Sequence, residues 1–320
     1  MATINPIKFA TPNGLEGILR LSAMISQEIN LLLRDTGNLR NSPFMSYQGS
    51  INGSGSDTIR VRLAGLDGYD SMLPATSEIS DESGNATALT IQSTDIVCAR
   101  QYLIYQLSDL ASMSHFGPSD VDPWRLASSI VGSYETRFAE LTATAASSFA
   151  TSKGANGDLF SVTALFEGIY QLEQADSGRG VPGPYAVVLA PKALSELQSS
   201  LRNETGNAIA QMASTAEMLK VKGRNYAGEL FGVEVYRSSA VFGNGSSGYD
   251  NYMCGAGCFG FADGVPDMIP GAAMDFMRTA KVLVEFDRAA MSAQTSVVGH
   301  AYMGISIIND LKGCKILSAQ

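Results

Sequence analysis

The 320-residue sequence predicts an α+β fold from the order of its elements and a subunit of an assembly from its composition. The candidate helices and strands do not alternate regularly, because one helix precedes a long strand-and-turn excursion, a long helix and then a mixed region. Charged residues make up only 17% of the chain, against about 25% in an average globular protein. We therefore expect much of the surface to face other protein subunits, as in a homo-oligomeric assembly.

The N-terminal third predicts one helix and an irregular pair of strands. Apolar residues recur at three- and four-residue steps over Leu15–Arg34, which is typical of an amphipathic helix. From Phe44 to Arg100 the pattern changes to strands near 57–63 and 88–96, separated by turns rich in Gly, Ser and Asp. This excursion has too few apolar residues for a core of its own. We expect another surface, such as a neighbouring subunit, to steady it.

A long helix is expected from Asp122 to about Lys153. Asp122 suits an N-cap, Pro123 suits the first helical position, and Gly154 suits the stop. About 30 residues at 1.5 Å each would give a helix of roughly 45 Å. The preceding segment, Tyr102–Ala111, also has a helix-like pattern.

The C-terminal half predicts mixed helices and strands. The expected helices are Val162–Gln174, Pro191–Leu201 and Ala208–Leu219. The expected strands are a buried run at Tyr185–Ala190, an alternating run at Leu230–Ser238, a glycine-rich strand pair at Met253–Asp263, and Lys281–Phe286 and His300–Ile308, followed by a short tail.

Charge and composition exclude several classes of protein. The net charge of −9 and the pI of about 4.8 argue against a nucleic-acid-binding protein with a basic surface. No basic and apolar leader opens the chain, and no apolar run approaches the ~20 residues that span a bilayer. Four cysteines are too few for a disulfide framework. We expect a soluble protein without membrane contact, made in a reducing cytoplasm.

Two motifs are compatible with a cofactor or metal, and each has a simpler explanation. Gly255–Gly260 matches the dinucleotide fingerprint, but Phe261–Pro266 cannot begin the helix which that motif requires, so a glycine-bearing strand or bulge is favoured. Cys254 and Cys258 lack the Cys-x-x-Cys spacing and second ligand pair of a structural zinc site. We expect these two cysteines to be buried small hydrophobes, and we expect no cofactor.

No catalytic constellation is visible. The two histidines, His115 and His300, have no nucleophile motif beside them, and His300 is more typical of a hydrogen-bonded core residue than of a base. No P-loop signature occurs. We therefore expect that the protein is not an enzyme.

Several short segments resemble one family across nearly the whole chain. They are Tyr185–Leu194 (strand, Pro, helix), Gly228–Arg237 (with Leu-Phe-Gly before an alternating strand), Phe259–Asp263, and the closing strands Val282–Phe286 and Tyr302–Ile308. Together with the arm, hairpin and long helix, they resemble the major capsid protein of tailed bacteriophages, with the Hong Kong 97-type fold.

The resemblance implies a domain organisation and a function. Residues 1–43 would form an N-terminal arm, 44–100 an extended β-hairpin loop, 101–180 with 276–320 a peripheral domain with the spine helix, and 181–275 an axial domain. Copies would assemble in the host cytoplasm as hexamers and pentamers. They would close an icosahedral virion capsid around double-stranded DNA, which is held without sequence specificity.

Charged residues of the hairpin are the candidates for contacts between subunits. Arg60 and Arg62 fall on one side of a strand, and the reciprocal acids would be Asp67, Asp70, Glu78, Asp81 and Glu82. Each of these residues is equally compatible with a solvated turn charge, and an exposed pair contributes only about 0–1 kcal/mol. Closure of a shell would then depend on many repeated contacts.

Two departures from the family pattern shape the expected partners. Some members link subunits through a loop lysine, but residues 44–152 contain no lysine, so a non-covalent shell or a separate cement protein is favoured. The arm begins close to Met1, so we expect a separate scaffolding protein, besides a portal. An encapsulin-type nanocompartment and an enzyme that uses Gly255–Gly260 are the alternatives.

Overall fold

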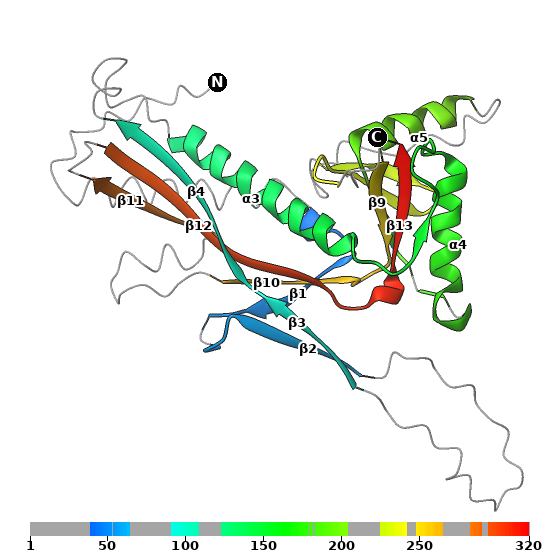
Figure 1. Ribbon diagram of the computed structural model, residues 1–320, viewed down its shortest axis with the longest axis horizontal. Helices are drawn as coiled ribbons and strands as arrows, with labels where there is room; N and C mark the ends of the chain where they lie inside the picture. The colour runs from blue at the N-terminus through cyan, green and yellow to red at the C-terminus, as the bar shows by residue number, and fades with distance from the viewer. Residues whose placement is uncertain are drawn as a thin grey trace, which may run out of the picture.

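The computed structural model confirms an α+β protein. It describes residues 39–52, 54–64, 91–108, 123–178, 180–181, 183–203, 225–241, 248–264, 282–289 and 294–319. These residues form a five-stranded sheet, a six-stranded sheet and a two-stranded hairpin, with helices packed on the two larger sheets (Figure 1).

The elements divide among these three sheets. The five-stranded sheet contains β1 (Met45–Ser50), β4 (Ala99–Ser108), β10 (Phe259–Gly264), β11 (Leu283–Ala289) and β12 (Gln294–Ile307). The six-stranded sheet has the order β5 (Ser152–Lys153), β13 (Gly313–Ala319), β9 (Gly248–Cys254), β6 (Tyr185–Leu189), β8 (Val233–Arg237) and β7 (Tyr226–Leu230). The hairpin is β2 (Thr58–Ala64) with β3 (Ile91–Val97). The helices are α3 (Pro123–Ala146), α4 (Val162–Gly178) and α5 (Pro191–Asn203), with short 3-10 turns η1 (Leu39–Asn41) and η4 (Asp310–Lys312).

Strand β12 organises the five-stranded sheet. Its residues 294–300 pair with both β11 and β4, so these two strands lie on opposite edges of β12. Residues 302 and 303 pair with both β10 and β4, so β10 follows β11 along the same edge. Helix α3 runs along one face of this sheet (Figure 1), where the rings of Phe138 and Phe261 lie 5.6 Å apart.

Helix α4 packs closely on the six-stranded sheet. A Cβ at Gly168 would lie 2.8 Å from Cδ1 of Ile316 and 3.1 Å from Cε of Met253, so a larger residue there would require these side chains to shift. The same face holds the buried Asn251, whose Oδ1 accepts from the amide of Ala190 at 2.8 Å and whose Nδ2 donates to Ser318 Oγ at 2.8 Å. This amide ties the end of β6 to β13.

An aromatic cluster joins the two larger sheets. Phe259, at the start of β10, is fully buried, and its ring lies 5.5 Å from Phe149, 6.1 Å from Phe44 and 6.1 Å from Tyr252. Phe44 also contacts Tyr236 edge-on at 5.8 Å. Rings at these separations add attraction beyond the burial of their area. The cluster therefore fixes how the two sheets meet.

The long helix is shorter than the sequence predicted. It ends at Ala146 instead of Lys153, and its 24 residues span about 36 Å at 1.5 Å each. The hydroxyls of Ser147 and Ser148 donate to the carbonyls of Thr144 and Ala145, each at 2.7 Å, and the amide of Ser148 donates to Ala145 three residues back, as in a tightening final turn. The chain then turns so that Phe149 enters the aromatic cluster.

Four other predictions of secondary structure were wrong, because tertiary pairing overrides the local pattern. The helix-like segment Tyr102–Ala111 begins as the strand β4. Leu230–Ser238 is not one strand, because a turn at Phe231 and Gly232 separates β7 from β8. The strands within Met253–Asp263 pair in different sheets, and the tail after His300–Ile308 forms β13.

The other predicted elements among the described residues are confirmed within a few residues. These are the hairpin strands, α4, β6, α5 and β11, whereas β12 ends as predicted but begins at Gln294, six residues before the predicted His300. The predicted helices Leu15–Arg34 and Ala208–Leu219, and the N-cap Asp122, lie outside the described residues. None of the described helices is long and apolar enough to cross a bilayer.

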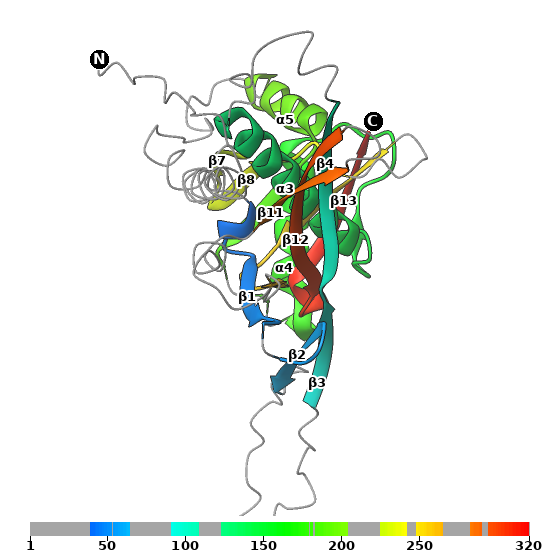
Figure 2. The ribbon, with the colours of Figure 1, turned by 90° about the vertical axis from the view of Figure 1, so that its left-hand side faces the viewer.

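The expected domain ranges stay a prediction. Within 44–100, strand β1 pairs in parallel with β10 and so belongs to the five-stranded sheet. Within 276–320, strand β13 pairs with β9 and extends the six-stranded sheet. Figure 2 shows the β2–β3 hairpin projecting beyond both of these sheets.

Candidate intersubunit surfaces

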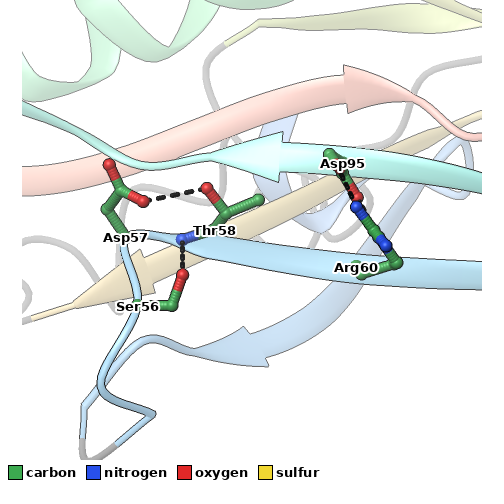
Figure 3. A network of polar contacts seen from close by, with 5 residues as sticks. All are labelled: Ser56, Asp57, Thr58, Arg60 and Asp95. Carbon is green, nitrogen blue, oxygen red and sulfur yellow. Dashed lines mark hydrogen bonds and ion pairs between the residues drawn. The ribbon is translucent and has the colours of Figure 1, made fainter.

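The β2–β3 hairpin has one apolar and one charged face. Arg60 lies opposite Asp95, and Ile59 lies opposite Ile96, so the two faces alternate along the strands. Arg60 binds Asp95 through two hydrogen bonds, Nε to Oδ1 at 2.7 Å and Nη2 to Oδ2 at 2.9 Å (Figure 3). This bidentate geometry is the strongest form of arginine–carboxylate contact.

The ion pair shifts the pKa values of Arg60 and Asp95 in opposite directions. The hydrogen bond from Arg60 lowers the pKa of Asp95, and the same bond raises the pKa of Arg60. Both side chains are largely exposed, with 62% and 41% of their surface accessible, so water and salt screen the attraction. From the sequence, Arg60 was predicted to contact a neighbouring subunit. The structure gives it a partner on its own hairpin.

Arg62 is the other predicted hairpin cation. It is exposed on the same face as Arg60, opposite Ser93, and no carboxylate among the described residues forms an ion pair with it. The predicted acids Asp67, Asp70, Glu78, Asp81 and Glu82 lie outside the described residues. Their role at an interface stays a prediction.

The root of the hairpin rests on a small second core. Ile96, Cys98 and Ala262 are buried together there, with Ile59 and Val61 packed against them. Burial, together with the nearby charge of Asp263, raises the pKa of Cys98 to about 11. A Cβ at Gly304 would lie 2.3 Å from the carbonyl oxygen of Val97, so glycine is required where β3 crosses β12.

A polar contact borders this root. The hydroxyl of Tyr47 donates to Oδ1 of the buried Asp263 at 2.9 Å. Burial, together with that hydrogen bond, raises the pKa of Tyr47 to about 12, so its hydroxyl stays protonated. Arg40 lies over the ring of Phe261 at 5.4 Å from its centroid. These contacts hold the segment that leads into β1 against β10.

The five-stranded sheet leaves an apolar face uncovered by the described residues. On β4, Tyr102 is 65% exposed and Ile104 is 46% exposed, on the face opposite to α3. Arg100 borders them, with its guanidinium 5.5 Å from the centroid of the Tyr102 ring. We call Tyr102, Ile104 and Arg100 the open sheet face. Exposed aromatic and aliphatic groups beside a cation are typical of protein interfaces.

His300 lies beside this open sheet face. It is buried, and its Nδ1 accepts a hydrogen bond from Nε of Arg100 at 3.2 Å. The prediction of a hydrogen-bonded core histidine is therefore confirmed. The other histidine, His115, lies outside the described residues.

The glycine-rich segment 255–260 connects the two larger sheets. The backbone amides of Gly255, Gly257 and Phe259 donate to carbonyl oxygens elsewhere in the chain, at 2.8, 3.1 and 3.0 Å. These three amides already donate hydrogen bonds within the chain, whereas a dinucleotide site would require free amides to bind the pyrophosphate. A Cβ at Gly260 would lie 2.6 Å from Cδ1 of Ile308, so close packing accounts for this glycine. The interpretation as a glycine-bearing strand is confirmed for Gly260, which lies in β10, whereas Gly255 and Gly257 lie in the turn between β9 and β10.

The four cysteines are buried and free. Burial and a hydrogen bond with Cys258 raise the pKa of Cys254, which keeps its thiol protonated and unreactive. Within the described parts of the chain, no three His, Cys, Asp or Glu side chains gather as metal ligands. The prediction that Cys254 and Cys258 are buried small hydrophobes is confirmed.

The fold is that of the major capsid proteins of tailed phages. Similar solved structures include the capsid of Ralstonia phage GP4 (TM-score 0.59, 12% identity, 89% of this chain and 91% of that chain). The head of Helicobacter pylori bacteriophage KHP40 is also similar (TM-score 0.57, 10% identity, 90% of each chain). So is the SrpI encapsulin from Synechococcus elongatus (TM-score 0.53, 12% identity, 90% and 86%). No family model and no curated protein matches the sequence.

Proposed function

We propose that this chain is a structural shell subunit that assembles as hexamers and pentamers into an icosahedral capsid around double-stranded DNA. One observation carries the proposal: phage capsid structures match about nine-tenths of this chain and of their own length. Most of the given chain is thus accounted for by a fold that the solved structures use in capsid shells. The proposed role is therefore structural and not enzymatic.

The β2–β3 hairpin and the open sheet face are the surfaces that would join the subunits. The hairpin buries only a small core at its root, and the open sheet face exposes Tyr102 and Ile104. In the proposed shell the hairpin of one copy lies over the open sheet face of a neighbour. Arg62 is then the hairpin cation free to meet a neighbour's acid, because Arg60 is held by Asp95.

We propose further contacts through the acidic residues of the hairpin and through other proteins of the virion. Asp67, Asp70, Glu78, Asp81 and Glu82 would supply the reciprocal charges. A separate scaffolding protein, a portal and a cement protein would complete a virion capsid assembled in the host cytoplasm. The DNA would be enclosed without sequence specificity, and a chain of net charge −9 offers its phosphates little overall attraction.

The test is assembly of the purified protein, alone and co-expressed with candidate scaffolding proteins. Negative-stain microscopy beside sedimentation should reveal closed shells or rings of five and six subunits. Particles with a head-sized diameter that protect DNA from nuclease would support the capsid. A uniform 33.8 kDa monomer in every co-expression, at high protein concentration, would contradict it.

An encapsulin-type nanocompartment is the second candidate, and the similarity to the SrpI encapsulin favours it. Such a shell would be smaller and would enclose a protein cargo in place of a genome. The same microscopy separates the two, because small empty or protein-filled shells without nuclease-resistant DNA would favour the nanocompartment.

A further inference from the structure

Three aromatic side chains lie exposed together on the six-stranded body. Phe166 and Tyr170, one helical turn apart on α4, are 47% and 57% exposed, and Phe231 is 50% exposed. The rings of Phe166 and Phe231 lie 4.9 Å apart, so helix and turn contribute to one surface. We call Phe166, Tyr170 and Phe231 the aromatic patch. It belongs to neither the hairpin nor the open sheet face.

The backbone at Phe231 is unusual for this residue type. Leu230 pairs with Val233, so Phe231 and Gly232 form a two-residue turn, with φ of 52° and 76°. Positive φ at both central positions favours Asn, Asp or Gly at the first of them, whereas a bulky side chain is strained there. The ring is also half exposed, so core packing does not account for the choice of Phe. A ring held outward at a conformational cost indicates a partner.

We propose that the aromatic patch binds a second copy of this chain, head to tail, within a ring of subunits. This inference rests on the proposed shell and names one of its contacts.

The charged residues near the aromatic patch favour a head-to-tail contact over a patch-to-patch contact. Glu173 is exposed on α4, seven residues after Phe166 and therefore on the same side of the helix. Two copies joined patch to patch would oppose these like charges. Arg237 is exposed at the opposite end of β8 from the Phe231 turn. Lys192 follows nearby at the start of α5, but its Nζ lies 3.8 Å from Oε1 of Glu196, so Arg237 is the cation that this contact would use. The patch of one copy therefore suits the Arg237 end of the next, and a head-to-tail contact can close into a ring.

The area of the patch alone is too small for a stable interface. Three half-exposed aromatic rings offer about 300 Å², since one such ring buries about 150–250 Å² in full. A stable interface needs about 800 Å² on each partner. The aromatic patch is thus the centre of a larger contact that a neighbouring copy completes.

The substitution Phe231→Asn separates a binding role from a folding role. Asn is favoured at this turn position, so the variant should unfold at an equal or higher temperature than the wild type. It should nevertheless need at least about tenfold more protein to form rings or shells, because truncating a central aromatic weakens an interface by that order. Phe231→Tyr keeps the ring and should assemble like the wild type.

Tyr170→Gln and Arg237→Glu provide independent tests at exposed positions. Both should retain the wild-type melting temperature, and each should raise the concentration needed for assembly, measured by sedimentation velocity. If the wild type assembles and Phe231→Asn and Tyr170→Gln assemble equally well, the inference is overturned while the proposed shell stands, and the patch faces some other protein. If the wild type never assembles, both proposals fail together.

Discussion

The six-stranded body and the β2–β3 hairpin differ in how much apolar surface each buries within this chain. The body holds fully buried strands such as β6, from Ala186 to Leu189, and meets the other sheet through the cluster around Phe259. The hairpin buries Ile96 at its root and carries the exposed Arg60–Asp95 pair further out. A body of the first kind is stable alone, whereas two strands of the second kind need a surface to rest on. The difference indicates which part of the chain folds and which part joins its neighbours.

The largest expected effect is on the junction of the two sheets. Phe259→Ala removes a ring that contacts three others and leaves a cavity. The variant should lose about 3–5 kcal/mol in the free energy of unfolding, measured by chemical denaturation. Leu311→Ala, at an exposed position, is the matched control and should change stability little. A loss below about 1 kcal/mol in Phe259→Ala would show that this cluster does not hold the body together.

A smaller loss is expected at the buried amide of the body. Asn251→Ala leaves the amide of Ala190 without its acceptor and the carbonyl of Ile316 without its donor, and both groups are buried. A stability loss of about 2 kcal/mol should follow, because buried polar groups without partners are costly. Stability equal to that of the wild type would mean that water replaces the amide.

The hairpin should respond locally. Gly304→Ala places a Cβ against the carbonyl of Val97 and should push β3 away from β12, with a loss of about 1–2 kcal/mol. Hydrogen exchange should accelerate in β2 and β3 and remain unchanged in β6 and β9. Gly132→Ala, in α3 with no atom within 4 Å of the added Cβ, is the control and should stabilise the protein by up to about 1 kcal/mol. Equal acceleration in β6 would contradict the independence of the hairpin.

The smallest expected effect concerns the Arg60–Asp95 pair. In the folded protein the pKa of Asp95 is below its ordinary value of 3.8. The ion pair therefore stabilises the folded state at any pH above 3.8, and this contribution disappears as the pH falls through the lowered pKa. Asp95→Asn should therefore leave the unfolding of the isolated subunit almost unchanged near pH 7, and should remove a slight acid dependence below about pH 4. A large loss at neutral pH would show that the hairpin depends on its charges more than on its root.

Much of the fold was predictable from local patterns, and the failures have a common cause. The wholly apolar run at β6 and the Pro191 start of α5 were identified correctly, because burial and proline chemistry act locally. Strand β4 was taken for a helix, because its exposed Tyr102 and Ile104 interrupt the alternation that a half-buried strand usually has. Phe231 was counted within a strand, because aromatic residues rarely occupy turns with positive φ.

The candidate site was less predictable than the fold. Arg60 and Arg62 were correctly placed on one face of a strand, but Asp95 was not named as the partner of Arg60. The aromatic patch had no sequence signal, since Phe166 and Phe231 are 65 residues apart and each fits an ordinary core pattern. Only their exposure in the folded chain distinguishes them.

The sequence by itself determined the α+β class, the two-stranded hairpin without a core and the low charge of a surface suited to neighbours, because these depend on composition and short-range periodicity. The tertiary structure alone decided that β9 and β10 part into two sheets, that Phe149 and Phe259 join those sheets, and that Phe231 points outward. Pairing between distant strands and packing between distant side chains depend on long-range contacts, and no local pattern specifies them.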